Sequence, residues 1–531
     1  MKNPHAVLNS YPPHNGTMHE AFLSRCKVQA DEIFLIQDDI ELTWREFGTR
    51  YQKLACALAA RGIAKGSRVA VIGKNDVAHV LALFALARLG AVMVPINPAF
   101  GLREMDYALK HADVQGIIAE QSVLQLVDEV ISGFEAAPWV LTMDGPVTET
   151  SNSLQSAIDT APSMSLDNDV QASDTCVIIY TSGTTGFPKG VMHSQRNFML
   201  AGESNVSRMH LQANDRLMVV LPFFHMNALF YSVGGALAAG ASLIVVPRFS
   251  ASSFWDTAAD KKATIVNIIE AIGTILCTRD RSEYRPDHRL RAAYGVRGKS
   301  APVFRDDFVI PHLFSGFGMT EIPGVTCNPY GGPGKAGSMG IVGIHPDPAQ
   351  PWAQCRIVDD EGNDVGDNEI GELWVKTPIV MQGYFRDPEQ TRAAFNDGWL
   401  MTGDLVKRDA DGFFFHISRK KDIIRRRGEN IAAAEIEMII NEHPSVYEVA
   451  ALAVPSELGE DDILVATVAK PGMPLDEAEI ADWCKQRLAA IKVPRYVVLL
   501  DTLPHTPTHK IAKAVLRNDP QVLARAIDMQ R

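Results

Sequence analysis

The apolar residues of the first four hundred positions form short continuous runs that alternate with longer segments of helical periodicity. Residues 68–73 predict a buried strand that ends at a glycine, residues 76–89 predict a helix, and residues 91–96 predict the next strand. The same alternation recurs at 116–119, 216–222 and 241–247. Short β-rich runs bounded by Gly and Pro, between longer amphipathic segments, are typical of α/β layers with largely parallel sheets.

The pattern changes after about residue 350. Residues 355–362 and 371–376 predict antiparallel strands joined by turn residues. A compact α+β unit closes the chain, with an expected helix at 432–443, strands at 448–454 and 463–469, and a helix at 476–488. We therefore predict a large N-terminal domain of layered α/β subdomains plus a β-rich subdomain, residues 1–418, and a small α+β C-terminal domain, residues 419–531.

Length and charge restrict the class of protein. A chain of 531 residues is too long for one core, and 46% hydrophobic with 21% charged residues is ordinary for a soluble globular protein. The net charge of −12 repels nucleic acid, so DNA or RNA is not expected as a main partner. The apolar stretch 80–94 is interrupted by Arg88 and Gly90, so we expect a buried helix followed by a strand and no membrane span.

The cysteines indicate a reducing compartment. Seven are scattered along the chain, an odd number with no CxxC pair, and the N-terminus has no apolar signal segment. Both features predict a cytoplasmic protein with structural thiols.

A loop rich in glycine and hydroxyl groups follows the strand predicted at residues 176–180. Residues 181–190 read Thr-Ser-Gly-Thr-Thr-Gly-Phe-Pro-Lys-Gly. Glycines let backbone N–H groups face an anion, hydroxyls add donors and Lys189 adds a cation, so the loop suits a triphosphate. Pro188 before the lysine, and no Ser or Thr after it, separate the loop from a P-loop. By composition alone, a flexible surface loop is the alternative.

This loop, with the following Val-Met, resembles the phosphate-loop signature of the AMP-forming acyl-CoA synthetase and ligase family. The chain resembles that family in the same order from about residue 42 to residue 517, and the stretches 93–97 and 383–389 look most like its crotonobetaine/carnitine–CoA ligase members. The resemblance implies that ATP activates a small carboxylic acid as its adenylate, with release of pyrophosphate, and that coenzyme A then takes the acyl group. It also implies Mg²⁺ as a cofactor and a homodimer as a possible assembly.

Further motifs complete the nucleotide site that the resemblance implies. Residues 316–321, Gly-Phe-Gly-Met-Thr-Glu, match a family motif in which Phe317 stacks on adenine and Glu321 binds Mg²⁺. Asp404 and Arg419 match the ribose contacts, because a carboxylate accepts both hydroxyls of a vicinal diol. Three of these residues also have an alternative without a ligand. Glu321 would cap a buried turn, Asp404 would lie in a tight turn, and Arg419 would be solvated. The implied nucleotide-binding residues are Thr181, Ser182, Gly183, Thr184, Thr185, Gly186, Lys189, Ser315, Gly316, Phe317, Gly318, Met319, Thr320, Asp404, Arg419 and Lys510.

The C-terminal part carries the implied moving elements. Residues 418–431 resemble the family's hinge and following loop, with Lys421 at the pivot. Lys510 matches the adenylating lysine, and the resemblance implies that rotation of the C-terminal domain withdraws it before thioester formation. The implied catalytic residues are Lys510, Glu321, Thr181 and His225, and those implied for coenzyme A are Arg427, Gly428 and Glu429. A solvated face is the alternative for the arginine run 425–427.

The acyl pocket is less sharply defined. His225, in Leu-Pro-Phe-Phe-His, resembles a residue that gates acyl entry, and a structural histidine is the alternative. The implied pocket residues are His225, Phe230, Val266, Gly295 and Ser315. Glu270 stands where relatives often have proline; it either faces the pocket and attracts a cationic or hydroxylated acyl group, or is solvated or paired. Around Val296 and Arg297 the chain departs from the family's adenine loop.

Two other functions compete with a coenzyme A ligase. An enzyme that loads a carrier protein normally needs an anchoring aspartate in its pocket and a carrier module, and neither is evident. A non-catalytic nucleotide-binding protein is disfavoured because several charged residues of the family site are present together, namely Lys189, Glu321, Asp404, Arg419 and Lys510.

Overall fold

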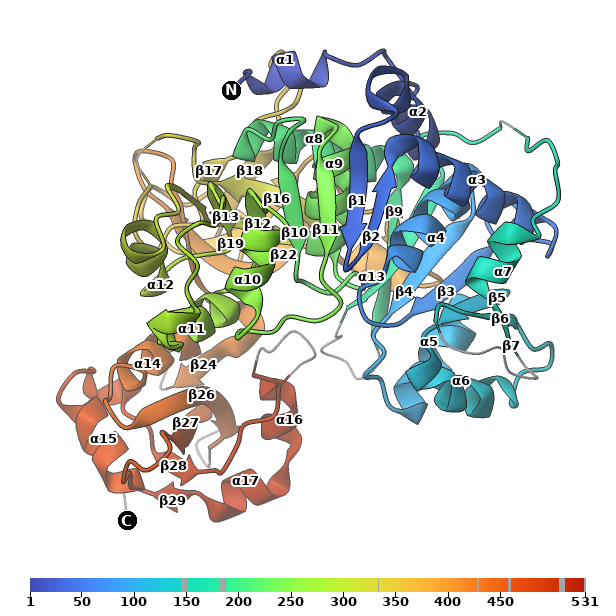
Figure 1. The fold of residues 1–531 in the computed structure, drawn as a ribbon. Coiled ribbons are helices and arrows are strands. Elements are labelled where there is room, and N and C mark those ends of the chain that lie inside the picture. Colours follow the sequence, from blue (N-terminus) through green and yellow to red (C-terminus); the bar gives the residue numbers. More distant parts are fainter. Residues whose placement is uncertain are drawn as a thin grey trace. The chain divides into compact units, whose positions relative to one another are not determined.

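The computed structural model describes residues 1–144, 151–167, 169–181, 188–332, 334–426, 429–456, 460–505 and 511–529. The chain forms two compact units. The first contains Met1–Gln354 and Lys376–Leu400, and the second contains Cys355–Val375 and Met401–Arg531 (Figure 1). The sequence instead predicts a boundary at residue 418, between the N-terminal domain and a C-terminal domain that is expected to move. That boundary stays a prediction.

An eight-stranded sheet in the first unit has the order β20-β9-β8-β4-β3-β5-β6-β7. Its parallel strands are β3 (Arg68–Ile72), β4 (Val92–Ile96), β5 (Gly116–Ala119), β6 (Trp139–Thr142), β7 (Ser151–Ser153) and β8 (Thr175–Thr181). Two antiparallel strands close one side, β9 (Lys189–Ser194) and β20 (Gly383–Tyr384). The largely parallel sheet predicted from the alternating pattern is therefore confirmed.

A seven-stranded sheet in the same unit has the order β14-β13-β12-β10-β11-β1-β2. Its strands are β1 (Ile33–Gln37), β2 (Ile40–Thr43), β10 (Arg216–Val219), β11 (Ser242–Val245), β12 (Ile265–Asn267), β13 (Ala292–Tyr294) and β14 (His312–Phe314). All neighbours are parallel except β1 and β2. A smaller antiparallel sheet follows, with β15 (Gly316–Met319), β16 (Ile322–Cys327) and β17 (Ile341–Val342).

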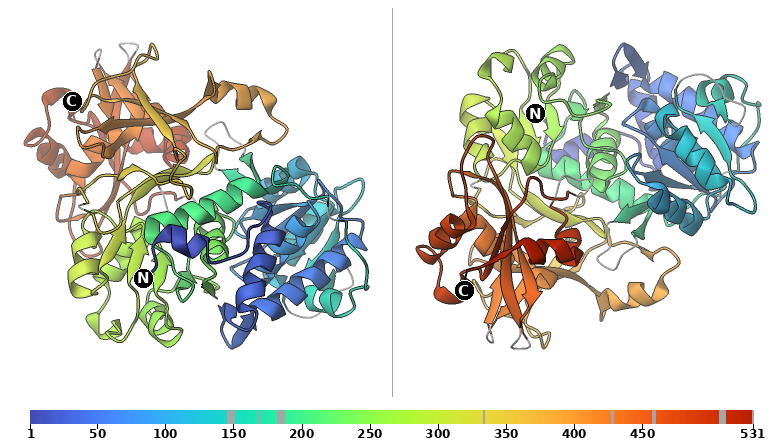
Figure 2. Two further views of the ribbon diagram at one scale, coloured as in Figure 1. Left: turned by 90° about the horizontal axis from the view of Figure 1, so that it is seen from above. Right: turned by 90° about the horizontal axis from the view of Figure 1, so that it is seen from below.

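One apolar core joins the two large sheets. It contains side chains from both sheets and from the helices α2 (Met18–Gln29), α3 (Trp44–Ala59), α4 (Val77–Arg88), α8 (Gln195–Met209) and α9 (Gly234–Ala239). A second core lies between the eight-stranded sheet and the helices α5 (Leu102–Ala112) and α6 (Leu124–Ile131), and Figure 2 shows these helices, in blue to cyan, beside their strands. The other helices of this unit are α1 (Pro4–Leu8), α7 (Leu154–Asp159), α10 (Phe254–Asp260), α11 (Glu270–Thr278), α12 (Ser300–Pro302) and α13 (Pro388–Ala393).

Helix α4 explains the long apolar stretch in the sequence. Its residues 78–87 are all buried, and the strand β4 follows it, as predicted for residues 80–94. Within the described ranges, none of the helices combines the length and apolar character needed to cross a bilayer.

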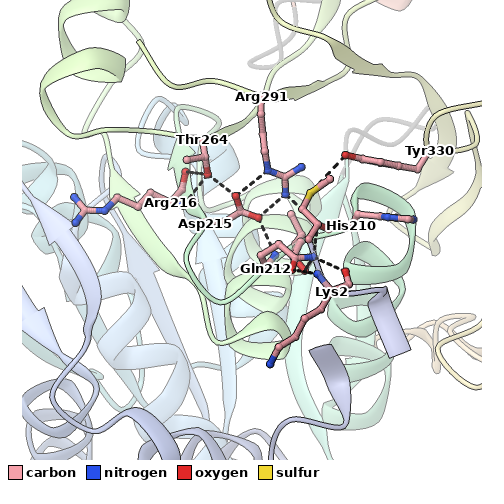
Figure 3. A network of polar contacts seen from close by, with 10 residues as sticks. Lys2, His210, Gln212, Asp215, Arg216, Thr264, Arg291 and Tyr330 are labelled. Atoms are coloured by element: carbon pink, nitrogen blue, oxygen red, sulfur yellow. Dashed lines mark hydrogen bonds and ion pairs between the residues drawn. The ribbon is translucent and has the colours of Figure 1, made fainter. Parts of the chain in front are cut away.

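A polar network ties together the amino ends of three strands of the seven-stranded sheet (Figure 3). Buried Asp215 precedes β10 and accepts hydrogen bonds from Arg291 Nε, at 3.0 Å, and from Thr264 Oγ1, at 2.7 Å. Thr264 and Arg291 directly precede β12 and β13. The second oxygen of Asp215 accepts the backbone N–H of Gln212, whose own amide oxygen accepts the N–H of Lys2. These bonds fix one end of the sheet and leave the carboxyl ends of the strands for other residues.

The second unit begins with strands β18 (Gln354–Val358), β19 (Gly371–Lys376), β22 (Trp399–Arg408) and β23 (Phe414–Arg419). In that sheet β19 lies between β18 and β22, β23 pairs with β22, and the short β21 (Phe395–Asn396) pairs with the first residues of β22. The antiparallel pair β24 (Ile423–Arg426) and β25 (Glu429–Ala432) follows.

The last sheet has the order β26 (Val446–Pro455), β27 (Asp461–Ala469), β28 (Tyr496–Leu499) and β29 (Ile527–Asp528). Side chains of a strand alternate between two faces. Val449 and Ala451 therefore meet α14 (Ala433–Ile440) and α15 (Glu477–Lys485), while Ala450 and Leu452 meet α16 (Lys513–Asn518) and α17 (Pro520–Arg525). The predicted helices and strands are present, but both helices end early. α14 ends at Ile440, before the predicted end at 443, because Pro444 follows closely, and α15 ends at Lys485, before the predicted end at 488.

Candidate active site

Several residues predicted for the acyl pocket follow the carboxyl ends of neighbouring parallel strands. His225 comes after β10, Gly295 directly after β13 and Ser315 directly after β14. In open α/β sheets ligands bind outside this edge of the sheet. The topology therefore places three residues that are far apart in the sequence along one edge of the same sheet, which sequence spacing alone could not reveal.

Phe230 and Val266, the other two residues predicted for the acyl pocket, are fully buried. Val266 is a residue of β12. Phe230 belongs to the π-helical segment η2 (Asn227–Val233), and its ring lies 5.0 Å from that of His193 and 5.2 Å from that of Phe198. Their place in the pocket stays a prediction.

Gly295 occupies a position that no other residue fits. Its φ is +91°, in the left-handed region, and an added Cβ would lie 1.9 Å from the Ile268 carbonyl oxygen. The close approach joins the loop after β13 to the loop after β12, so it sets the shape of this edge of the sheet.

The predicted phosphate loop connects two paired strands. Thr181, at the end of β8, is the register partner of Lys189, at the start of β9. The Thr181 hydroxyl donates to the Lys189 carbonyl oxygen at 3.5 Å. The predicted residues between them, Ser182, Gly183, Thr184, Thr185 and Gly186, lie outside the described residues.

Glu321, the predicted magnesium ligand, lies in the turn between β15 and β16. Its exposed fraction is 7%, and its Oε1 accepts a hydrogen bond of 2.8 Å from the Tyr384 hydroxyl. The Lys189 ammonium lies 4.9 Å from the centroid of the Tyr384 ring. Burial, followed by the adjacent Glu321 carboxylate, raises the pKa of Tyr384, so its hydroxyl stays protonated and serves as a donor. Tyr384 thus joins the carboxylate from one sheet to the lysine from another.

His193 fixes the backbone on the other side of the same turn. Its Nε2 lies 2.6 Å from the Thr320 carbonyl oxygen, and its Nδ1 lies 3.1 Å from the amide nitrogen of Asn197. The amide donates to Nδ1, so Nε2 carries the hydrogen and donates to the carbonyl. Burial lowers the pKa of His193 to about 4, and the ring is therefore neutral near pH 7.

Glycines keep the β15–β16 hairpin tight. An added Cβ at Gly316 would lie 2.4 Å from the Thr326 carbonyl oxygen, and one at Gly318 would lie 2.5 Å from the Gly324 backbone nitrogen. Between them, the backbone N–H of Phe317 donates to the Thr326 hydroxyl at 3.0 Å. Phe317 is buried and Met319 pairs with Ile322, so the predicted adenine-binding segment has a fixed backbone.

The second unit contains the predicted ribose carboxylate. Asp404, on β22, is 1% exposed and pairs across the ladder with Arg419 on β23. Its Oδ1 accepts from Arg419 Nε at 2.8 Å and from His416 Nε2 at 3.0 Å. Within the part of the chain that the structure describes, Oδ2 has no hydrogen-bond partner. A buried carboxylate oxygen without a donor is suited to accept a hydrogen bond from a hydroxyl group of a ligand.

The predicted hinge and coenzyme A residues lie next to this sheet. Lys421 belongs to a single 3₁₀ turn, Lys420–Asp422, between β23 and β24. Glu429 begins β25, whereas Arg427 and Gly428 lie outside the described residues. Arg426 is buried and its Nη1 donates to the carbonyl oxygens of Ile491 and Val493, so this member of the arginine run is structural and not part of a solvated face.

Lys510, the predicted adenylating lysine, also lies outside the described residues. The two residues that flank the undescribed segment, His505 and Ile511, form an antiparallel backbone bridge with each other. His505 in turn contacts Glu448 Oε2 of β26 at 2.9 Å.

Glu270 is paired. It is the first residue of α11, and its two oxygens accept the backbone N–H of Arg297, at 2.9 Å, and the Ser300 hydroxyl, at 3.0 Å. Of the two alternatives, the paired carboxylate is the one observed. It holds the loop around Val296 and Arg297, where the sequence departs from the family pattern.

Three contact residues of the site were not found from the sequence. Tyr384 appeared there only inside a stretch that resembles relatives, and His193 and His416 gave no signal. Tyr384 and His193 contact the turn between β15 and β16, and His416 contacts Asp404 on the neighbouring strand. Only the tertiary arrangement could have revealed these contacts.

The layers and parallel strands define an α/β protein, and several of the predicted site residues follow the carboxyl ends of its strands. The chain belongs to the AMP-binding enzyme family: residues 22–385 match the AMP-binding enzyme family itself, and residues 435–510 match the AMP-binding enzyme C-terminal domain.

Individual relatives agree with this assignment. The chain is 31% identical to the long-chain-fatty-acid–CoA ligase of Mycobacterium tuberculosis over 90% of this chain and 93% of that protein. It is 28% identical to the crotonobetaine/carnitine–CoA ligase of Shigella flexneri over 90% and 93%. The crystal structure of an anthranilate CoA ligase in complex with anthranoyl-AMP superimposes with a TM-score of 0.86 at 25% identity, over 99% of this chain and 100% of that one.

Proposed function

We propose that the chain is an AMP-forming acid–thiol ligase that converts a carboxylic acid, ATP and coenzyme A into an acyl-CoA, AMP and pyrophosphate. The observation that carries this proposal is the match to both parts of the AMP-binding enzyme family, together with relatives named as CoA ligases. That agreement disfavours the loading of a carrier protein.

The first step makes the acid a good acyl donor. A carboxylate oxygen attacks the α-phosphorus of ATP, the bond to pyrophosphate breaks, and a mixed anhydride with AMP forms. The reaction requires positioning and stabilisation of negative charge on phosphoryl oxygens. Thr181 and Lys189 lie at the two ends of the proposed phosphate loop. The Lys189 ammonium would neutralise charge on those oxygens, and the Thr181 hydroxyl would donate a hydrogen bond to them.

Glu321 is proposed to hold the magnesium ion. Mg²⁺ takes one or two carboxylates and completes its shell with water and phosphate oxygens. A nearly buried carboxylate, fixed through one oxygen by Tyr384, fits that requirement. No group of three or more metal-binding side chains occurs in the described ranges, and none is needed for such a site. When bound there, the ion would neutralise charge on the phosphates.

Asp404 is proposed to accept the ribose hydroxyls. His416 and Arg419 occupy one of its oxygens and keep the carboxylate oriented, so the other oxygen remains for the ligand. Lys510 is proposed to bind the phosphoryl oxygens during adenylation only.

The second step replaces AMP by sulfur. The thiolate of coenzyme A attacks the acyl carbon, the bond to AMP breaks and the thioester forms. Arg427, Gly428 and Glu429 are proposed to contact coenzyme A, and Lys421 is proposed as the pivot that exchanges Lys510 for the thiol. A cytoplasmic homodimer also stays a prediction.

Pyrophosphate release over a panel of acids, with and without coenzyme A, tests the proposal. We expect pyrophosphate to be released from ATP in the presence of some of the acids. Coenzyme A should stimulate this release and yield a thioester. Turnover only with a phosphopantetheinylated protein would instead establish carrier loading. No release with any acid, from a correctly folded protein that still binds ATP, would establish a non-catalytic nucleotide-binding protein.

A further inference from the structure

Arg208 is a buried cation that the proposed chemistry does not use. It lies near the end of α8, and its exposed fraction is 4%. Its Nε donates to the Ser204 carbonyl oxygen at 3.4 Å, within the same helix. Among the described residues, neither Nη1 nor Nη2 has a hydrogen-bond partner. Because arginine keeps its charge in proteins, a full positive charge sits in the interior beside the Tyr231 phenol, and no carboxylate among the described residues pairs with it.

The head group of Arg208 lies between an aromatic ring and a glycine. Its central carbon is 4.8 Å from the centroid of the Tyr231 ring. On β16, an added Cβ at Gly324 would lie 2.4 Å from Nη1, so a side chain at that position would displace the guanidinium. The space beside β16 therefore accommodates this head group only because residue 324 is glycine.

Two phenols lie beside the guanidinium. The Tyr231 and Tyr294 rings are 5.6 Å apart and packed edge to face. An added Cβ at Gly318 would lie 2.9 Å from the Tyr231 hydroxyl, and one at Gly316 would lie 2.8 Å from the Tyr294 hydroxyl. Both hydroxyls therefore face strand β15, and they add two donors to those of the arginine.

Three residues around the guanidinium are chain neighbours of residues predicted for the acyl pocket: Tyr231 of Phe230, Tyr294 of Gly295, and Gly316 of Ser315. Tyr231 also belongs to the π-helical segment η2, and π-helical turns are frequent at functional sites.

A buried charge without a counter-charge is costly, and proteins normally pair it with an opposite charge or remove it. A carboxylate matches the parallel N–H groups of a guanidinium, and it also accepts from hydroxyl groups. We propose that Arg208, with the hydroxyls of Tyr231 and Tyr294, binds a second anionic group of the substrate, at the end remote from the reacting carboxylate. The substrate class is then dicarboxylic acids, or acids with another anionic group in that place. The inference rests on the proposed function.

Matched substrates test the inference in the unmodified protein. Thioester formation is measured for linear dicarboxylates of three to eight carbons and for monocarboxylates of the same lengths. We expect the best dicarboxylate to exceed its monocarboxylate in kcat/KM by at least about 30-fold, the effect of one buried, hydrogen-bonded charge pair. A preference for monocarboxylates at every length would overturn the inference, and this comparison needs no variant.

Variants of Arg208 distinguish recognition from a structural role. Arg208→Gln should abolish the preference for the dicarboxylate while the KM for ATP and turnover of monocarboxylates persist, and Arg208→Lys should restore part of it. Arg196→Gln, at an exposed position on the same helix, is the control and should leave both series unchanged. An equal loss in both series in Arg208→Gln would show a structural role and contradict the inference.

Calorimetric titration of the preferred dicarboxylate separates the two proposals. Binding that depends on Arg208 without any thioester product would support this site and refute the proposed ligase. Turnover of acids with no discrimination at Arg208 would support the ligase and refute this site.

Discussion

At the scale of single residues, the proposed chemistry depends on side chains that orient other side chains. Tyr384 donates to Glu321 and lies under the Lys189 ammonium. Tyr384→Phe removes only the hydroxyl. Because partners that orient a metal ligand typically contribute 10- to 100-fold to affinity or activity, we expect the Mg²⁺ concentration for half-maximal pyrophosphate release to rise by about 10-fold. Tyr447→Phe, at an exposed position, is the control. An unchanged magnesium titration would remove Glu321 as the ligand.

His416 has a comparable relation to Asp404. His416→Phe removes one of two donors to Oδ1 and leaves Arg419 in place. A hydrogen bond to a charged group contributes about 1.5 kcal/mol, so the KM for ATP should rise by about 10-fold, with a smaller change in kcat. His5→Phe, at an exposed position, serves as the control. A loss confined to kcat would show that His416 does not act through nucleotide binding.

The residues with proposed direct roles were identified from local motifs, whereas their contact partners could not be. Glu321 and Asp404 stand in short sequence patterns that a resemblance identifies. Tyr384 and His193 contact the turn between β15 and β16, and His416 contacts Asp404 across the β22–β23 pair; no local sequence pattern contains these contacts. Arg208 gives no signal in the sequence either, because only burial distinguishes it from a surface arginine of a helix.

At the scale of elements, the carboxyl ends of parallel strands are followed by residues predicted for the acyl pocket. Gly295 is the tightest point of that arrangement, at a φ of +91° and with no room for a Cβ. Gly295→Ala should therefore lower the thermal unfolding temperature and reduce acid turnover more than ATP binding. Gly62→Ala is the matched control, since Gly62 also has a positive φ, +84°, but nothing within 4 Å.

The control isolates the steric contribution. A left-handed alanine alone costs roughly 1–2 kcal/mol, so Gly62→Ala should be mildly destabilised and fully active. Equal effects of the two substitutions would show that the contact with Ile268 does not shape the site.

The elements themselves were predictable because their periodicity is local. Strand β3 and helix α4 follow directly from one buried run and one apolar segment, and β26 follows from its alternating faces. The strand order was not predictable, since β20 enters the eight-stranded sheet from far along the chain beside β9. That insertion is what brings Tyr384 to Glu321.

At the scale of the whole molecule, the two proposed half-reactions need different residues. Adenylation takes place at the α-phosphorus, and thioester formation takes place at the acyl carbon. Lys510 is proposed for the first half-reaction only. Lys510→Ala should abolish adenylate formation, measured as acid-dependent pyrophosphate release, but largely spare thioester formation from supplied acyl-adenylate. The control is Lys485→Ala, at an exposed position in the second unit, which should preserve both half-reactions. Equal loss of both in Lys510→Ala would contradict its role.

The most direct test of the account is a crystal structure of the protein with ATP or a stable acyl-adenylate analogue. We predict that the phosphates, or the group that replaces them, lie against residues 181–190, between the ends of β8 and β9. A ligand bound at another place, or a protein that binds neither compound in solution, would contradict the proposed function.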